Sequence, residues 1–165
     1  MSNYAAQERA RWWPVPAELM AQYKDGSHTD EDRCGSLEWW QNDQRHRDGD
    51  LPAFIDADGT LEWYQNNLRH RDGDRPAIIW ANGSLGWCKN NQWHRVGDLP
   101  AVIQANGVLH WYQDNQRHRF GGPAIIWPSG TLEWWYWRGE KIPVRSQEEF
   151  IEYLILHRLI ESEAL

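Results

Sequence analysis

The stretch Gly59-Thr60-Leu61-Glu62-Trp63-Tyr64 decides the fold of this chain, because it recurs in variant forms along most of the sequence. Successive copies are 24 residues apart three times and then 23 residues apart. A fixed period of this length is typical of one supersecondary unit stacked on copies of itself. The sequence therefore predicts a repeat array over residues 35–143. The other copies begin at Gly35, Gly83, Gly107 and Gly130.

Each unit is predicted to be a β-hairpin closed by a two-residue turn. Asparagine, aspartate and glycine tolerate the positive φ angles that such a turn requires, and they occur at the centre of the unit. A lone hairpin is marginally stable in water, so the units must stack to be stable. The predicted turns are Asp58-Gly59, Asn82-Gly83 and Asn106-Gly107.

The predicted turn fixes which residues of a unit face the core. In that register Phe54 pairs with Trp63, and Ile55 pairs with Glu62. Because strand side chains alternate between the two faces of a sheet, Phe54, Leu61 and Trp63 form the predicted core stripe. Ile55 and Glu62 are expected on the other face. The corresponding core residues of the later units are Ile78, Leu85, Trp87, Val102, Leu109, Trp111, Ile125, Leu132 and Trp134.

The two ends of the chain differ from the repeats and are predicted to cap them. Residues 1–34 contain a polar stretch and are expected to be irregular. Residues 144–165 are expected to form a helix, because Ser146 and Glu149 have the spacing of a capping box and an apolar face follows them. The predicted fold is an all-β repeat: tandem β-hairpins in a single-layer twisted sheet, with a C-terminal capping α-helix over its last edge.

The composition indicates a folded chain despite its polarity. The chain has 165 residues and a formal net charge of −7, and its mean hydropathy of −0.83 would suit a disordered segment. The 13 Trp residues instead favour a packed aromatic core. A membrane-spanning helix and a secretory signal are not expected, since the sequence lacks the long apolar runs that both require. A cytoplasmic location is therefore predicted.

The sequence offers no motif that points to catalysis, a cofactor or a metal. We find no Gly-rich phosphate loop, no nucleophile elbow and no clustered metal ligands. The carboxylates Glu38 and Glu62 recur at one position of the unit, but Gly86 and His110 interrupt the series. A catalytic residue is normally unique in a chain, so these repeated carboxylates do not indicate catalysis. The histidines of successive units would lie about 10 Å apart, too far to share one metal ion. A non-enzymatic protein is predicted.

The His-Arg pair of each unit has two interpretations. It could form a basic ladder that binds anions, or a scaffold in which His and Arg stack on Trp and bond to carboxylates of the turns. Nearly identical use in every unit favours the scaffold. The pairs are His46-Arg47, His70-Arg71, His94-Arg95 and His118-Arg119.

A second aromatic position gives the candidate binding surface. The column Trp40, Tyr64, Cys88, Tyr112 and Trp135 is either a stacking platform or a minor core. A variable position, which could supply specificity, holds Asp56, Trp80, Gln104 and Trp127. Trp80 and Trp127 are expected on the face of the core stripe, near its margin. The candidate partner-binding residues are Trp40, Tyr64, Trp80, Trp93, Tyr112, Trp127, Trp135, Arg45, Arg69 and Arg117.

The block from Trp63 to Arg71, followed by Gly and Pro-Ala, resembles a repeat of bacteriophage, giant-virus and bacterial proteins that is similar to the MORN repeat. That repeat is written W-Y-x-N-G-x-x-H-R-x-D-G-P-A, and residues 118–124 match its second half. Asn67, Asn91 and Asn115 stand where glycine is usual, and three units have one extra residue before proline. The resemblance implies a twisted hairpin array that binds partners. MORN arrays serve as scaffolds, as dimerisation modules and as binders of phospholipid head groups, and the family carries no catalytic residues.

These observations lead to three hypotheses of function. The first is a protein-binding repeat protein, for example a phage-encoded inhibitor of a host defence protein. The second is a carbohydrate or cell-wall binding module that uses the Trp and Tyr columns. The third is binding of anions or phospholipid at a membrane surface along the Arg ladder; the acidic chain disfavours nucleic acid. A homodimer through an exposed N-terminal hairpin edge is a further expectation.

Overall fold

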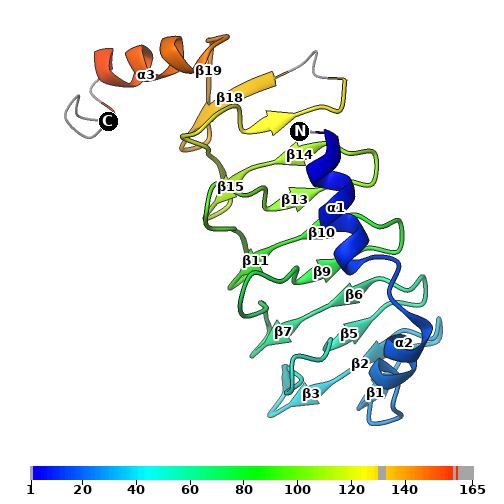
Figure 1. The fold of residues 1–165 in the computed structure, drawn as a ribbon. Coiled ribbons are helices and arrows are strands. Elements are labelled where there is room, and N and C mark those ends of the chain that lie inside the picture. The colour runs from blue at the N-terminus through cyan, green and yellow to red at the C-terminus, as the bar shows by residue number, and fades with distance from the viewer. Residues whose placement is uncertain (1, 130–132, 158, 160–165) are drawn as a thin grey trace.

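The computed structural model describes residues 2–129, 133–157 and 159. Among these residues the chain forms one long antiparallel sheet, an open sheet in which the strands follow one another in chain order (Figure 1). The predicted architecture of tandem hairpins is therefore confirmed. The strands of the long sheet are β1 (Asp30–Glu31), β2 (Leu37–Glu38), β5 (Phe54–Ile55), β6 (Leu61–Glu62), β9 (Ile78–Ile79), β10 (Leu85–Gly86), β13 (Val102–Ile103), β14 (Leu109–His110), β17 (Ile125–Ile126), β18 (Glu133–Trp137) and β19 (Glu140–Ile142).

Each repeat contributes a second, shorter hairpin along one side of this sheet (Figure 1). We number the units 1 to 4 by their first residues, which are Gly35, Gly59, Gly83 and Gly107. The short hairpins pair β3 (Trp40–Gln41) with β4 (Gln44–Arg45), β7 (Tyr64–Gln65) with β8 (Leu68–Arg69), β11 (Cys88–Lys89) with β12 (Gln92–Trp93), and β15 (Tyr112–Gln113) with β16 (Gln116–Arg117).

The hairpins of the long sheet have a different turn from the predicted one. Ile55 pairs with Leu61 rather than with Glu62. The two-residue turn was wrong because the loop contains three residues, with Gly59 at φ 93° as its left-handed residue. The Gly59 N–H donates to the carbonyl of Asp56 at 2.9 Å. This is a type I turn followed by a glycine bulge, which shifts the register by one residue.

The shifted register exchanges the faces of one strand in each unit. Ile55 and Leu61 are fully buried and lie opposite each other in the core, whereas Phe54 is half-buried on the other face. Ile78, Val102 and Ile125 pair in the row of Phe54 and so lie on the other face from the predicted stripe. Ile78 and Ile125 are nevertheless buried, as predicted, and Ile125 belongs to the main core cluster. Leu132 and the side chain of Trp134 lie outside the described residues. The core row is Leu37, Ile55, Leu61, Ile79, Leu85, Ile103, Leu109 and Ile126.

The two-residue turns occur instead in the short hairpins, where asparagine also links neighbouring units. Asn66 and Asn67 have φ of 51° and 65°, as a type I′ turn requires. The Asn67 side chain accepts a hydrogen bond from the Arg45 N–H at 2.6 Å, and the Asn67 N–H donates to the Arg45 carbonyl at 3.0 Å. Asn91 and Asn115 make the same side-chain bond to the preceding unit. Asparagine at this position therefore joins the units in a way that glycine could not.

An arginine stacks on the tryptophan of every unit on the core side of the sheet. The guanidinium carbons of Arg47, Arg71, Arg95 and Arg119 lie 3.7–3.9 Å from the ring centroids of Trp39, Trp63, Trp87 and Trp111. Arg71 also donates to both carboxylate oxygens of Asp50 in the preceding unit, at 2.7 and 2.9 Å, and to the Pro76 carbonyl at 3.1 Å. The scaffold interpretation of the repeated arginine is confirmed.

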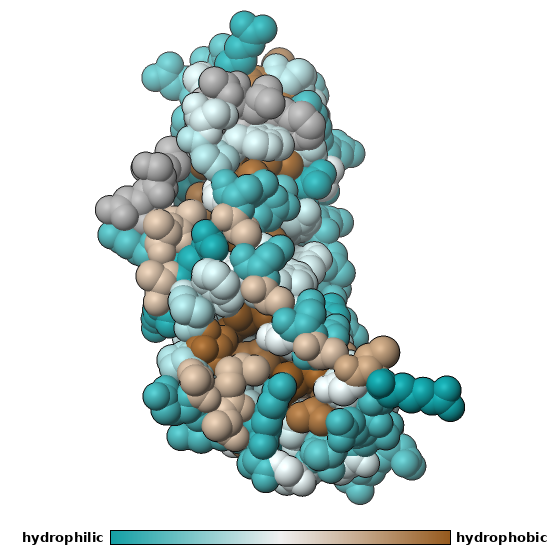
Figure 2. All heavy atoms as spheres, turned by 90° about the vertical axis from the view of Figure 1, so that its right-hand side faces the viewer, coloured by the Kyte–Doolittle hydropathy of each residue, from teal (hydrophilic) through white to brown (hydrophobic). Residues whose placement is uncertain are grey.

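The N-terminal segment is helical, contrary to the expected irregular cap over residues 1–34. Helix α1 (Ser2–Trp12) lies along the core side of the sheet and crosses several strands, and α2 (Ala17–Tyr23) follows it (Figure 1). Arg9 holds α1 in place by donating to the carbonyls of Gly83 and Ala105 at 2.9 and 3.0 Å. This helix was not predicted from the sequence because α1 lacks a regular apolar stripe. It docks through arginine and single aromatic residues instead. Figure 2 shows this side of the molecule, where apolar atoms gather in the lower half and hydrophilic atoms surround them.

The C-terminal helix α3 (Gln147–Leu156) is shorter than the predicted 144–165 but has the predicted cap. The Ser146 side chain accepts from the Glu149 N–H at 3.1 Å. Phe150 and Leu154 are fully buried against β18 and β19, so the helix covers the end of the array as expected. Ile160 and the residues after it lie outside the described part of the chain. None of the described helices has the length and apolarity needed to cross a membrane.

The opposite end of the long sheet is β1, and both of its side chains are exposed. A short edge strand that consists of Asp30 and Glu31 is a poor template for pairing with another chain, because it is brief and charged. The homodimer expected through this edge stays a prediction.

We predict that Arg71→Met lowers the free energy of unfolding by roughly 2–4 kcal/mol. The variant removes the cation that stacks on Trp63, and it leaves the Asp50 carboxylate with Arg75 but without Arg71. Asp50 is part exposed, which limits the loss. Urea unfolding followed by Trp fluorescence measures the change. The control is Lys89→Met on the exposed surface, for which about 0.5 kcal/mol or less is expected. Equal losses for the two variants would contradict the stack as a main support of the fold.

Candidate functional site

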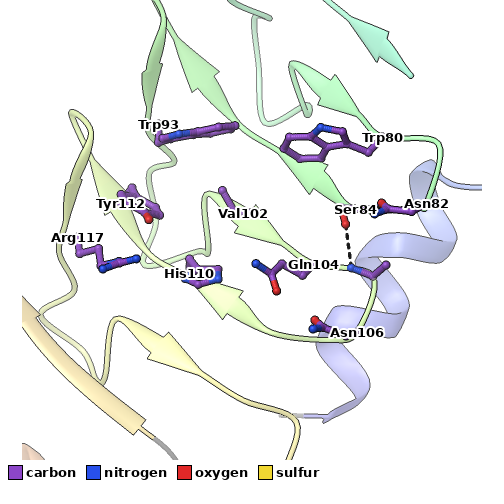
Figure 3. A pocket seen from close by; sticks show the side chains of 11 residues that line it. Trp80, Asn82, Ser84, Trp93, Val102, Gln104, Asn106, His110, Tyr112 and Arg117 are labelled. Carbon is purple, nitrogen blue, oxygen red and sulfur yellow. Dashed lines mark hydrogen bonds between the residues drawn. The ribbon is translucent and has the colours of Figure 1, made fainter. Parts of the chain in front are cut away.

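A groove lies on the open face, by which we mean the face of the sheet opposite α1. It has a volume of about 630 Å³ and is built from units 2, 3 and 4. Figure 3 shows the lining side chains projecting from the strands, with α1 behind them. The residues that carry its chemistry are Trp80, Trp93, Gln104, His110, Tyr112 and Arg117.

Units 1 and 2 show what the open face looks like where no groove is present. Arg69 forms an ion pair with Glu62 at 2.8 Å, and the Tyr64 hydroxyl donates to the same carboxylate at 2.7 Å. Arg45 likewise pairs with Glu38 at 2.5 Å. In these two units the arginine, the carboxylate and the aromatic ring satisfy one another and fill the surface.

Unit 3 replaces all three members of this network. Gly86 stands for the carboxylate residue, Cys88 for the tyrosine and Trp93 for the arginine. The rings of Trp93 and Trp80 have their centroids 6.0 Å apart with an interplanar angle of 33°, and we call this pair the Trp shelf. A Cβ on Gly86 would come within 2.7 Å of Trp93 and 2.9 Å of Trp80. Glycine at position 86 is therefore what allows the two rings to come this close to the strand.

Unit 4 keeps the arginine and the tyrosine but replaces the carboxylate by His110. Among the described residues no ion pair joins Arg117 to a carboxylate, and its buried Nε has no hydrogen-bond partner. The buried Nδ1 of His110 has no partner there either. Burial, followed by the positive charge of Arg117, lowers the pKa of His110 to about 4. His110 is therefore neutral at pH 7 and leaves Arg117 as a cation without a counter-charge in the groove.

Side-chain amides complete the opposite rim of the groove (Figure 3). The Oδ1 atoms of Asn82 and Asn106 accept hydrogen bonds from the backbone N–H groups of Ser84 and Val108 at 2.9 and 3.1 Å, which fixes both amides beside their turns. Gln104 points into the groove between them. These residues present donors and acceptors next to the Trp shelf without adding charge.

The structure brings four of the ten candidate residues into the groove: Trp80, Trp93, Tyr112 and Arg117. It engages the others elsewhere. Arg45, Arg69 and Tyr64 satisfy the carboxylates of units 1 and 2, and the part-exposed Trp40 donates its indole N–H to Glu38 at 2.7 Å. Trp135 is buried under α3, and Trp127 packs against the core.

Trp80 was placed wrongly by the sequence, beside the core stripe. It lies on the open face because Ile79, and not Ile78, is the core residue of β9. Sequence reasoning placed Gln104 at the variable position but did not count it, or His110, among the candidate binding residues. The available signal was the break of the carboxylate series at Gly86 and His110, which coincides with the groove.

The groove can stack, hydrogen-bond and attract one negative charge. No carboxylate of the described residues lines it, and no three potential metal ligands in that part of the chain lie close enough together to hold an ion. Beneath it, burial raises the pKa of the Cys88 thiol to about 12, so this cysteine is an unreactive packing residue at neutral pH.

We predict that His110 makes the fold less stable as the pH falls from about 6.5 to about 4. The unfolded chain protonates this histidine near its ordinary pKa, whereas the folded chain keeps it neutral until about pH 4, so protons favour the unfolded state. At pH 5 the penalty is about 2 kcal/mol. Urea unfolding at pH 7 and pH 5 should show a smaller loss for His110→Gln than for the wild type. The same loss in both proteins would contradict the assignment.

Comparison of the chain with protein-family models, with curated proteins and with solved structures gives no match. The geometry of the groove and its departures from the repeat are therefore the basis on which a function is argued.

Proposed function

We propose that this chain is a non-enzymatic binding protein and that its groove takes a carbohydrate chain. The observation that carries the proposal is the Trp shelf with side-chain amides beside it. A pyranose ring presents apolar C–H groups on its faces and hydroxyls around its rim. The faces can stack on Trp80 and Trp93, and the hydroxyls can bond to the amides of Gln104, Asn82 and Asn106.

The composition of the groove favours carbohydrate over the other small ligands. A nucleotide would bring a multiply charged phosphate, but the groove offers a single cation, Arg117, and no cradle of backbone N–H groups. The volume of the groove lies in the range of ligand pockets. The groove is also open to solvent, so an oligosaccharide that is longer than the groove can extend beyond it. A continuous Arg ladder for phospholipid is disfavoured, because the arginines of units 1 and 2 have carboxylate partners within the protein.

The repeat array supports this role as a rigid frame. We propose that it is a MORN-like solenoid, which agrees with the period of the units and with the hairpin that each adds to the sheet. Its curved sheet would display specificity residues where the repeat varies. A cytoplasmic location is part of the proposal, since Cys34 and Cys88 are both free thiols.

We predict that Trp80→Ala and Trp93→Ala each weaken glycan binding at least about tenfold, because each removes half of the stacking surface. Isothermal titration with chito-oligosaccharides, muropeptides, neutral plant-type oligosaccharides and uronic-acid oligosaccharides measures the affinity. Trp40→Ala is the matched control, since it removes a part-exposed tryptophan of the open face outside the groove. Absence of binding to the whole panel by the wild-type protein would sink the proposal.

A protein target is the second candidate, and a different surface favours it. The position that holds Asp48 and Asp72 in units 1 and 2 holds Val96 and Phe120 in units 3 and 4. Val96 is 65% exposed and Phe120 is 39% exposed. Two neighbouring units thus replace a solvated carboxylate by an apolar side chain, which is the composition expected of a protein contact.

We predict for this second candidate that the double variant Val96→Asp/Phe120→Asp loses a protein partner while it keeps the fold. Both substitutions restore the residue of units 1 and 2, so stability should stay within about 1 kcal/mol. A partner captured by the wild type is tested against the variant at equal concentration. The control is Leu68→Gln, which restores the residue of the other units at an exposed position. Undiminished capture by the double variant would exclude this surface.

A further inference from the structure

We propose that the end of the groove formed by Arg117 and His110 is a subsite for one carboxylate group, and that the bound chain is an acidic saccharide. The ligand carboxylate would act toward Arg117 as Glu38 and Glu62 act toward the arginines of units 1 and 2. This inference rests on the proposed carbohydrate function and specifies the chemical class of the ligand.

The protein contains its own template for this interaction. In unit 2 the Glu62 carboxylate accepts from Arg69 Nε at 2.9 Å and from the Tyr64 hydroxyl at 2.7 Å. Unit 4 retains the arginine and the tyrosine as Arg117 and Tyr112, on the same strands of the unit. His110 stands at the third position and supplies no carboxylate, and the cavity borders it. A carboxylate from outside can complete the same three-membered arrangement.

Arg117 is held in position for such a ligand. Its guanidinium carbon lies 5.9 Å from the ring centroid of Tyr112 and 5.3 Å from that of Tyr136, so two aromatic rings restrict its movement. Its Nε is buried and has no hydrogen-bond partner among the described residues. A guanidinium binds a carboxylate with two parallel hydrogen bonds, and pre-positioning reduces the entropy lost on binding.

His110 leaves Arg117 without the negative charge that a glutamate at this position would supply. Because burial and the nearby Arg117 hold its pKa low, the ring is neutral at pH 7 and carries one N–H donor and one acceptor. It therefore does not neutralise Arg117 as Glu62 neutralises Arg69. A neutral ring next to a cation that has no carboxylate partner among the described residues suits one additional negative charge.

The charge balance of the groove favours a single carboxylate over a phosphate. Arg117 is its one cation among the described lining residues, so one negative charge on the ligand restores the balance found in units 1 and 2. The Trp shelf in the same groove requires that the anionic group belong to a ligand with stackable rings. A uronic acid or another carboxylated sugar within an oligosaccharide combines both features.

Matched pairs of saccharides test this inference by isothermal titration. The pairs are trigalacturonate with its methyl ester, a hyaluronan tetrasaccharide with its methyl ester, and sialyllactose with lactose. We expect at least one acidic member to bind, and its neutral match to bind at least tenfold more weakly. If neutral members bind as tightly as acidic ones, the subsite is wrong and the carbohydrate function stands. If no saccharide binds, both fail, and binding of a glutamate-rich peptide in their place would identify a different class of ligand.

The variant His110→Glu provides the sharpest control, because it rebuilds the ion pair of units 1 and 2 within unit 4. The fold has already accepted glutamate at this position twice, so thermal unfolding should occur at the wild-type temperature or above it. Binding of the acidic saccharide should fall at least tenfold, and binding of a neutral saccharide should fall less than that. His110→Gln, which adds no charge, should keep the preference for the acidic member. Retention of that preference by His110→Glu would overturn the proposal.

Discussion

The stacking of an arginine on the tryptophan of each unit is the interaction on which the rest of the structure depends. A hairpin of this size has too little apolar surface to be stable alone. The guanidinium of Arg71 covers the ring of Trp63 at 3.8 Å and at the same time bonds to Asp50 of the unit before it. One side chain therefore completes the core of its own unit and attaches that unit to its neighbour. This explains why the pair recurs four times while the open face varies.

The open face is free to vary because the other side of the sheet supplies the packing. In units 1 and 2 it is closed by arginine–glutamate pairs, and in units 3 and 4 the substitutions Gly86, Trp93 and His110 open it into the groove. Each substitution has a separate physical effect: glycine admits two rings, tryptophan provides a stacking surface, and histidine leaves Arg117 without a counter-charge in the described part of the chain. In a repeat protein the departures from the repeat thus locate the candidate site.

Much of the fold followed from the sequence, but one turn changed the assignment of faces. The period, the hairpins, the C-terminal cap at Ser146 and the structural role of the repeated arginine were predictable from local patterns. The turn after Ile55 was not, because Asp-Gly suits both a two-residue turn and a three-residue loop with a glycine bulge. The choice between them moved Phe54 out of the core and Trp80 onto the open face. Helix α1 was missed because Arg9 anchors it to backbone carbonyls that are distant in sequence.

The sequence by itself determined the repeat, its hairpin composition and the residues that could bind a partner, since these depend on local spacing and side-chain chemistry. Only the tertiary structure decided which four of those ten residues meet. Trp80 and Arg117 are separated by more than one repeat, and they face the same groove because consecutive units add their strands side by side in a common register. Long-range hydrogen bonds between units set that register. These bonds cannot be predicted from the local sequence of any one unit.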